Sequence, residues 1–280
     1  MHVRVNNPLA IALIGIVFVA GCTAPAGSSN AKAPSPLVGT VGGGEIPLLG
    51  QPLPFNLTSC KGATLKLRVP HEVVRGALPP AFDAFQQYPG LSMIVIQTML
   101  CDKLARDGQD VGPASFSMSF VPLKNPSSAP TPAGWGPAYL LEIGSSDASL
   151  LAAARVRRIP NWNCSYSGSV TPFPITFETV VGTLLTNSQD TLLSFEIRPS
   201  PFSKAIQEKF RMFYGDNPNT GFLNVTAVGA DSSGDGPGTV KLVGATKAKA
   251  AAANSPEAIV NGMRIHDRNI EIWGFAAVEG

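Results

Sequence analysis

Charged side chains are scarce in this chain. Only 14% of its 280 residues are Asp, Glu, Lys or Arg, and 21 basic against 19 acidic residues give a net charge of +2. Nucleic-acid-binding surfaces need clustered positive charge with interleaved aromatic residues, and no such stripe occurs. The sequence therefore argues against a nucleic-acid partner. Because 44% of the residues are hydrophobic, the chain can bury a sizeable core and is not disordered throughout.

Residues that bind metals are equally few. The chain has 3 histidines and 4 cysteines. It contains no Cys-x-x-Cys pair, and His71 and His266 are far apart. This pattern predicts no metal site, and nothing in the sequence calls for a cofactor.

What is present begins with an export signal at residues 1–21. Arg4 precedes an apolar run from Leu9 to Ala20 that is too short to span a bilayer comfortably. The stretch VAGC at its end resembles the lipobox of bacterial lipoproteins. The resemblance implies that Cys22 becomes the first mature residue and carries lipid; a plain cleaved signal or a transmembrane anchor is the alternative. Membrane lipid is then a partner. The expected location is the bacterial cell envelope outside the cytoplasm, at the outer membrane where one exists.

Residues 22–54 are rich in Pro, Gly, Ser and Ala and contain only Lys32 and Glu45 as charges. Such a segment buries too little apolar area to offset the entropy of ordering it, so we expect a flexible tether whose later part can dock. Residues 55–280 are expected to form a single β-rich domain.

Three cysteines remain beyond Cys22, namely Cys60, Cys101 and Cys164. In an oxidising compartment they predict one disulfide and one free thiol, and their spacing does not fix the pairing. We favour Cys60 with Cys164, because Cys101 lies in an apolar strand and can stay buried as a small hydrophobe.

Short strands dominate the predicted domain. The segment 63–69 alternates apolar Leu65 and Leu67 with Lys66 and Arg68, the period of a half-buried strand. Similar segments recur from residue 91 to the C-terminus. Helical spacing is confined to residues 71–79, 147–158 and 203–215. The predicted class is α+β, with a mainly antiparallel, closed or strongly bent, barrel-like sheet and a few short helices.

Two stretches carry a family resemblance. LRVPHEVVRGALPPAF resembles the opening of the acetoacetate decarboxylase-like superfamily, and AYLLEIGSSDASLLAAARVRRIPNWN resembles its centre, with Tyr139 and Glu142 near a family motif. In that family a lysine after the proline forms a Schiff base with a β-keto acid. Here the corresponding residue is Asn161, whose amide cannot form an imine, and Val156 replaces the motif's glutamate. Lys103 is the nearest alternative lysine, and CDKLARDG is typical of a solvated turn.

Arg155 and Arg158 are three residues apart on the predicted helix and share a face, from which Arg157 is rotated away. They form either a fork that holds a carboxylate or a solvated face with salt bridges to Asp147 or Glu142. We therefore predict a lipid-anchored domain that binds a small carboxylate or another apolar acid without Schiff-base chemistry. The ligand-binding candidates are Arg155, Arg158, Tyr139, Glu142 and Asn161. The alternatives are a lyase-like enzyme of the same superfamily with Glu142 as acid or base, and a structural or protein-interaction lipoprotein.

Overall fold

A computed structural model describes residues 38–41, 44–47, 55–106, 108–126, 131–169, 180–186, 191–219, 221–242 and 259–276. Side chains are described within 55–106, 108–126, 131–165, 205–219 and 221–229. The predicted signal, the lipid site at Cys22 and most of the predicted tether lie outside the described residues.

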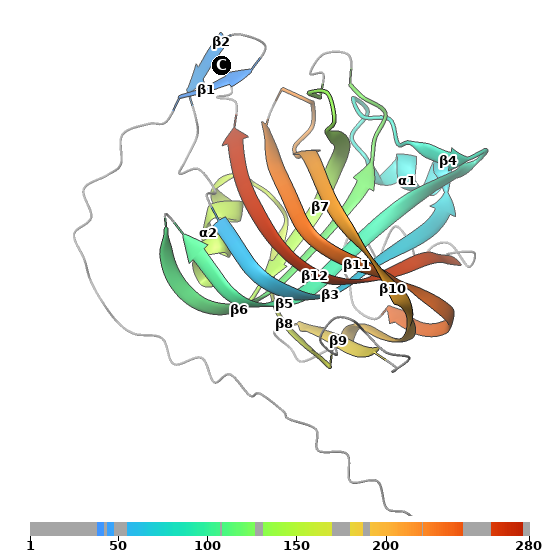
Figure 1. The fold of residues 1–280 in the computed structure, drawn as a ribbon. Coiled ribbons are helices and arrows are strands. Elements are labelled where there is room, and N and C mark those ends of the chain that lie inside the picture. The colour runs from blue at the N-terminus through green and yellow to red at the C-terminus, as the bar shows by residue number, and fades with distance from the viewer. Residues whose placement is uncertain are drawn as a thin grey trace, which may run out of the picture. The chain divides into compact units, whose positions relative to one another are not determined.

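Twelve strands and two short helices make up the described chain (Figure 1). The strands are β1 (Val38–Val41), β2 (Gly44–Pro47), β3 (Phe55–Pro70), β4 (Gln86–Tyr88), β5 (Leu91–Arg106), β6 (Gln109–Pro122), β7 (Gly136–Ser145), β8 (Asn161–Ser169), β9 (Val180–Thr186), β10 (Thr191–Phe213), β11 (Gly221–Leu242) and β12 (Ile259–Ala276). The helices are α1 (His71–Ala77) and α2 (Ala148–Val156). No helix among the described residues is long and apolar enough to cross a membrane.

Strands β3 to β12 form one strongly curled sheet in the order β3-β12-β11-β10-β9-β8-β7-β6-β5-β4 (Figure 1). Two additional pairings, of β3 with β5 and of β10 with β7, join strands that this order separates. The hydrogen-bonded neighbours therefore run from β3 through β12, β11, β10, β7, β6 and β5 back to β3. Within this sheet β7 is parallel to β8 and to β10, and the other pairings are antiparallel. The predicted α+β class with a bent, barrel-like sheet is confirmed. Strands β1 and β2 form a separate antiparallel pair within the predicted tether.

The core follows the alternation of side chains along the strands. On β5, Val95, Gln97, Met99 and Cys101 point to one face, because successive strand residues point to opposite faces. That face packs with β6 and β10 into the main apolar cluster, whose members include Phe55, Leu57, Met99, Phe116, Met118, Phe120, Met212 and Tyr214. Burying side chains of this size stabilises a fold by roughly 1.5–3 kcal/mol each relative to exposing them.

Helix α2 confirms the prediction for residues 147–158, and its ends are locally encoded. The Asp147 carboxylate caps the first turn by accepting a hydrogen bond from the Leu150 amide at 2.7 Å. At the other end, the Ile159 amide donates to the Ala154 carbonyl at 3.0 Å and the Arg158 amide to the Arg155 carbonyl at 2.9 Å. These two bonds define a Schellman motif, with Arg158 in the left-handed conformation at φ 55°. The helix therefore ends before Arg158.

The helix predicted at residues 203–215 is wrong, because this segment belongs to β10. Its Lys, Gln and Glu residues favour a helix locally, but the segment pairs with β11 from Ser203 to Phe213 without interruption. Phe210 and Met212 alternate with Arg211, whose guanidinium lies 4.2 Å from the centre of the Phe222 ring. Pairing and packing along a whole strand outweigh the small differences in helix propensity.

Candidate functional site

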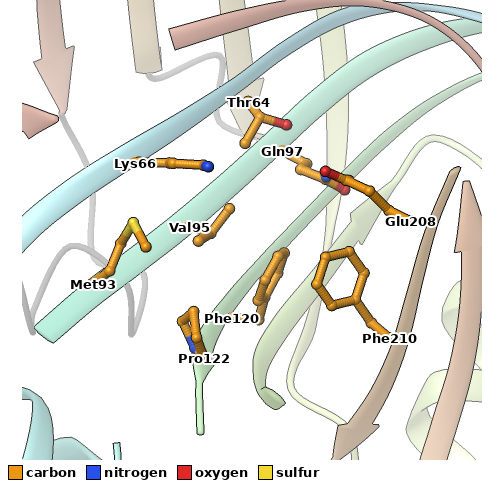
Figure 2. A pocket seen from close by; sticks show the side chains of 9 residues that line it. All are labelled: Thr64, Lys66, Met93, Val95, Gln97, Phe120, Pro122, Glu208 and Phe210. Carbon is orange, nitrogen blue, oxygen red and sulfur yellow. The ribbon is translucent and has the colours of Figure 1, made fainter. Parts of the chain in front are cut away.

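A cavity of about 110 Å³ lies between strands of the curled sheet (Figure 2). Four strands supply its lining, namely β3, β5, β6 and β10. The lining residues are Thr64, Lys66, Met93, Val95, Gln97, Phe120, Pro122, Glu208 and Phe210. Its volume is of the order of an apolar cavity known to admit benzene, about 150 Å³. The space suits a small organic molecule.

Register places the polar groups of the cavity close together. Thr64 lies directly opposite Gln97 in the β3–β5 pairing, and Lys66 lies opposite Val95. In Figure 2 these polar side chains and Glu208 lie in the upper part of the view. The lower part holds the apolar wall of Met93, Phe120, Pro122 and Phe210. The Phe120 and Phe210 rings pack with centroids 5.4 Å apart. The cavity thus has a polar end and an apolar end.

Gln97 is, with Thr64, one of two buried polar residues of this lining. Only 3% of the residue is exposed, and its Oε1 has no hydrogen-bond partner among the residues that the structure describes. Its backbone carbonyl is used, because it accepts a hydrogen bond from Ser117 Oγ at 2.9 Å. An unpaired buried acceptor costs about 1–3 kcal/mol, so this oxygen favours any cavity occupant that can donate to it.

The sequence pattern did not indicate these polar residues as a site, for identifiable reasons. The alternation of Leu65, Lys66 and Leu67 predicts that Lys66 lies on the polar side of a half-buried strand. The alternation is confirmed, but the side that carries Lys66 faces the cavity. Gln97 stands within an apolar run and Glu208 within the segment predicted as a helix, so neither position was recognised. The polar pair Gln97 and Thr98, which interrupts the apolar run 93–101, was the available signal for Gln97.

Arg155 and Arg158, the predicted anion clamp, do not line this cavity. Both are exposed, and the Schellman turn removes Arg158 from the helical face that it was expected to share with Arg155. Arg155 Nε instead donates to Asn161 Oδ1 at 3.2 Å, and Asn161 Nδ2 donates to the Ile159 carbonyl at 2.8 Å. The Asn161 amide thus fastens the turn after α2. Ligand binding by this group stays a prediction.

Among Arg155, Arg157 and Arg158, Arg157 is the buried one. It is 5% exposed, and its guanidinium Nη1 donates to the Ala153 carbonyl at 3.0 Å, at the C-terminal end of α2. Burial lowers the pKa of Arg157, and the interaction with Tyr214 opposes that shift. A cation at a helix C-terminus is favoured by the helix dipole, which helps to offset its desolvation. Arg157, which was predicted to point away from the shared face of Arg155 and Arg158, therefore has a structural role.

Tyr139 and Glu142 of β7 are both buried, and neither is among the cavity residues. The Tyr139 hydroxyl donates to the Gly215 carbonyl at 3.1 Å, and its ring packs 4.9 Å from that of Phe82. Glu142 Oε1 accepts a hydrogen bond from Ser119 Oγ at 2.8 Å. These contacts tie β7 to its neighbours, and a catalytic or ligand-binding role for either residue stays a prediction.

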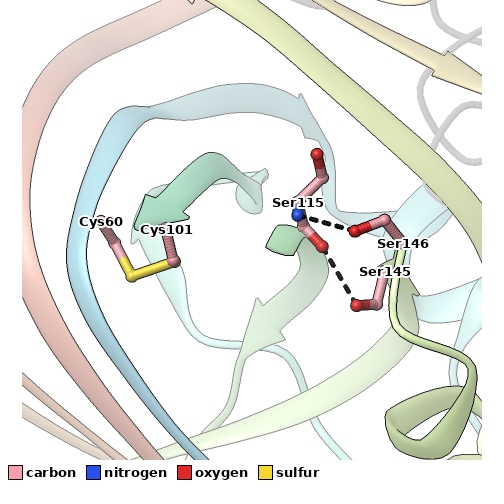
Figure 3. The surroundings of a disulfide bond; sticks show 5 residues. All are labelled: Cys60, Cys101, Ser115, Ser145 and Ser146. Carbon is pink, nitrogen blue, oxygen red and sulfur yellow. Dashed lines mark hydrogen bonds between the residues drawn. A yellow bond between two sulfur atoms is a disulfide. The ribbon is translucent and has the colours of Figure 1, made fainter. Parts of the chain in front are cut away.

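The predicted disulfide between Cys60 and Cys164 is wrong, because Cys60 bonds to Cys101 (Figure 3). The two residues are directly opposite each other in the β3–β5 register. Pairing of β3 with β5 brings the two sulfur atoms together. The apolar strand around Cys101, which was expected to leave it as a buried thiol, does not prevent the bond. Figure 3 also shows Ser115 of β6 held by two serines: its amide donates to Ser146 Oγ at 2.9 Å, and its carbonyl accepts from Ser145 Oγ at 3.0 Å.

Cys164 is therefore the free thiol, buried on β8, and burial raises its pKa. A protonated, inaccessible thiol is a poor nucleophile, so this position does not support cysteine catalysis. Within the described side chains, no group of three or more His, Cys, Asp or Glu is arranged to hold a metal ion.

The mainly antiparallel, strongly curled sheet and its short helices form an acetoacetate decarboxylase-like fold, as comparison with solved structures shows. No protein-family model and no curated protein sequence matches the chain. Solved structures do match. An acetoacetate decarboxylase aligns with 15% identity and a TM-score of 0.51, covering 83% of this chain and 91% of that one.

Two further structures agree in fold. The enduracididine biosynthesis enzyme MppR complexed with pyruvate has 11% identity and a TM-score of 0.51, covering 81% of this chain and 89% of its own. An acetoacetate decarboxylase-like enzyme from Sphingomonas wittichii RW1 has 12% identity and a TM-score of 0.50, with 81% and 92% covered. At these identities the likeness establishes the fold alone.

Proposed function

We propose that this chain is a lipid-anchored binding protein whose acetoacetate decarboxylase-like domain holds a small organic acid in the cavity of β3, β5, β6 and β10. The observation that carries the proposal is the lining of that cavity, in which the amine of Lys66 and the amide of Gln97 stand beside an apolar wall. Ligand sites commonly combine apolar walls with a few placed polar groups. The pyruvate named for the MppR structure is also a small carboxylate and is consistent with this ligand class.

Binding without Schiff-base chemistry is the form of the proposal that the residues favour. Asn161 occupies the position of the family's lysine and is hydrogen-bonded to Arg155 and Ile159. Lys66 does line the cavity, but it lies on β3, whereas Asn161 lies at the start of β8. Treatment of the protein and a keto acid with borohydride is therefore expected to leave no covalent adduct. An adduct mapped to Lys66 would overturn the non-catalytic form of the proposal.

The acid-binding test uses a matched pair of lysine variants. Lys66→Gln removes the cavity's amine, whereas Lys103→Gln removes a half-exposed amine that pairs with Asp110 at 2.9 Å. A charge-assisted hydrogen bond is worth about 1.5–3 kcal/mol, so Lys66→Gln should raise the Kd for a bound acid by about tenfold or more. Lys103→Gln should leave the Kd unchanged. Calorimetric titration of the full chain with short apolar acids measures both, and equal Kd values would refute the cavity as the site.

Membrane attachment through Cys22 is tested separately. Lipid chains bury about 0.8 kcal/mol per CH₂ group, so two or more hold a soluble domain on a membrane surface. Cells expressing the wild type should incorporate labelled fatty acid into the protein, and Cys22→Ser should abolish the label. Continued labelling of the Cys22→Ser protein would contradict the lipid anchor without affecting the cavity proposal.

A further inference from the structure

The polar end of the cavity contains more than one charge and one acceptor. Lys66 can hold a carboxylate, but the adjoining Gln97 Oε1 can only accept a hydrogen bond, and Glu208 adds a carboxylate to the same lining. A simple carboxylic acid, ionised at neutral pH, has no hydrogen-bond donor to offer Gln97 Oε1. The lining is therefore better matched by a molecule that carries an acid and a hydrogen-bond donor together.

The spacing of these groups limits how far apart the acid and the donor can be. Thr64 and Gln97 are cross-strand partners, and Lys66 is two residues along β3 from Thr64. Gln97 and Lys66 are therefore diagonal neighbours on one face of the sheet, with Cα atoms about 7–8 Å apart. Both side chains line the same small cavity (Figure 2), so one small ligand can meet the polar ends of both.

Charge decides between a hydroxyl and an ammonium group as the donor. A hydroxyl can satisfy Gln97 Oε1, but it gains little from the Glu208 carboxylate. An ammonium group donates three hydrogen bonds and is attracted by Glu208, because opposite charges in a partly dehydrated cavity interact strongly. The apolar wall that includes Phe120 and Phe210 then receives an uncharged side chain.

We propose that the cavity binds a small apolar amino acid as a zwitterion, with its carboxylate at Lys66 and its ammonium group at Gln97 and Glu208. This inference rests on the proposed function, since it names which acid the cavity takes. Displacing water from the Gln97 oxygen by a group that cannot donate loses affinity, so the site should discriminate against keto and unsubstituted acids of the same carbon skeleton.

The test compares four ligands of one shape: valine, α-hydroxyisovalerate, α-ketoisovalerate and isovalerate. Calorimetric titration of the full chain in detergent should give valine the lowest Kd, at least about tenfold below α-ketoisovalerate. Gln97→Met keeps the side chain's length and removes its oxygen, and it should erase the preference of α-hydroxyisovalerate over α-ketoisovalerate. Glu208→Gln should erase the preference of valine over α-hydroxyisovalerate. Glu72→Gln, on the exposed face of α1, is the matched control and should change none of the four Kd values.

The outcomes separate the inference from the proposed function. Equal affinity of the wild type for valine and α-ketoisovalerate would overturn the amino-acid assignment and leave acid binding intact. No binding of any of the four would overturn both. Near-ultraviolet circular dichroism shows whether the buried Gln97→Met change unfolds the protein. If it does, the Glu208→Gln variant still tests the ammonium site, because Glu208 is only partly buried. An unchanged order of affinities in that variant would refute the ammonium site.

Discussion

Cys60 and Cys101 lie directly opposite each other on β3 and β5 and are joined by a disulfide, while Cys164 stays buried as a thiol. The bond closes a sequence separation of 41 residues. It also joins two strands of the face on which the cavity lies. The covalent link and the ligand site therefore depend on the same strand pairing.

Peptide mapping without reduction should recover Cys60 linked to Cys101 and Cys164 free. Closing a loop of this length restricts the unfolded chain by about 4 kcal/mol in the chain-entropy estimate. Cys60→Ala and Cys101→Ala should each lower the free energy of unfolding by an amount of this order. The double variant should lose little more than either single variant, because both remove one bond. Mapping that links Cys164 to either partner would contradict the structure.

Close approach of β3 and β5 next to the disulfide gives a second prediction. A Cβ at Gly62 would lie 2.1 Å from the Thr98 carbonyl oxygen and 2.5 Å from Met99 Cα, both backbone atoms that cannot move aside. Gly62→Ala should therefore lower the free energy of unfolding by about 1–3 kcal/mol or more. Gly76→Ala in α1 meets no atom within 4 Å and should be neutral or stabilising by up to about 1 kcal/mol. Urea unfolding of both variants measures the contrast, and similar effects would argue against this strand spacing.

The left-handed conformation of Arg158 predicts a stabilising change. A residue with a Cβ pays roughly 1 kcal/mol or more to adopt φ near 55°, and glycine does not. Arg158→Gly should raise the free energy of unfolding by about 0.5–1 kcal/mol, whereas Arg158→Ala should give no such gain. Thermal unfolding of the two variants distinguishes this turn from a helix continuing through residue 158, in which glycine would destabilise.

Alkaline pH should expose the burial of Tyr214. Burial raises the pKa of its phenol to about 12 from an ordinary value near 10. Between these values the unfolded chain has lost the proton and the folded chain keeps it, so the free energy of unfolding falls as pH rises. The full contribution, about 2–3 kcal/mol, is present below pH 10 and is lost toward pH 12. Tyr214→Phe should reduce the difference in urea midpoint between about pH 8 and about pH 11.

The pKa of Tyr139 is also raised by burial, so Tyr139→Phe should show the same effect in the same direction. A wild-type midpoint that does not fall in this range would contradict both assignments.

Local sequence determined the short elements of this protein. The Asp147 cap, the apolar residues of α2 and the alternation of Leu65, Lys66 and Leu67 are set by neighbours a few residues away, and each element was predictable for that reason. The barrel-like class also followed from the number and length of alternating segments. The resemblance of two stretches to acetoacetate decarboxylases agreed with the fold.

Tertiary structure alone decided which residues meet. Alternation shows that Lys66 and Leu67 face opposite sides, but the closure of the sheet decides that the side of Lys66 faces the cavity. Register between distant strands placed Cys60 against Cys101 and Thr64 against Gln97, and the sequence contains no local record of that register. Pairing with β11 likewise made a strand of residues 203–213, because hydrogen bonds and packing along a whole strand outweigh a weak helical preference.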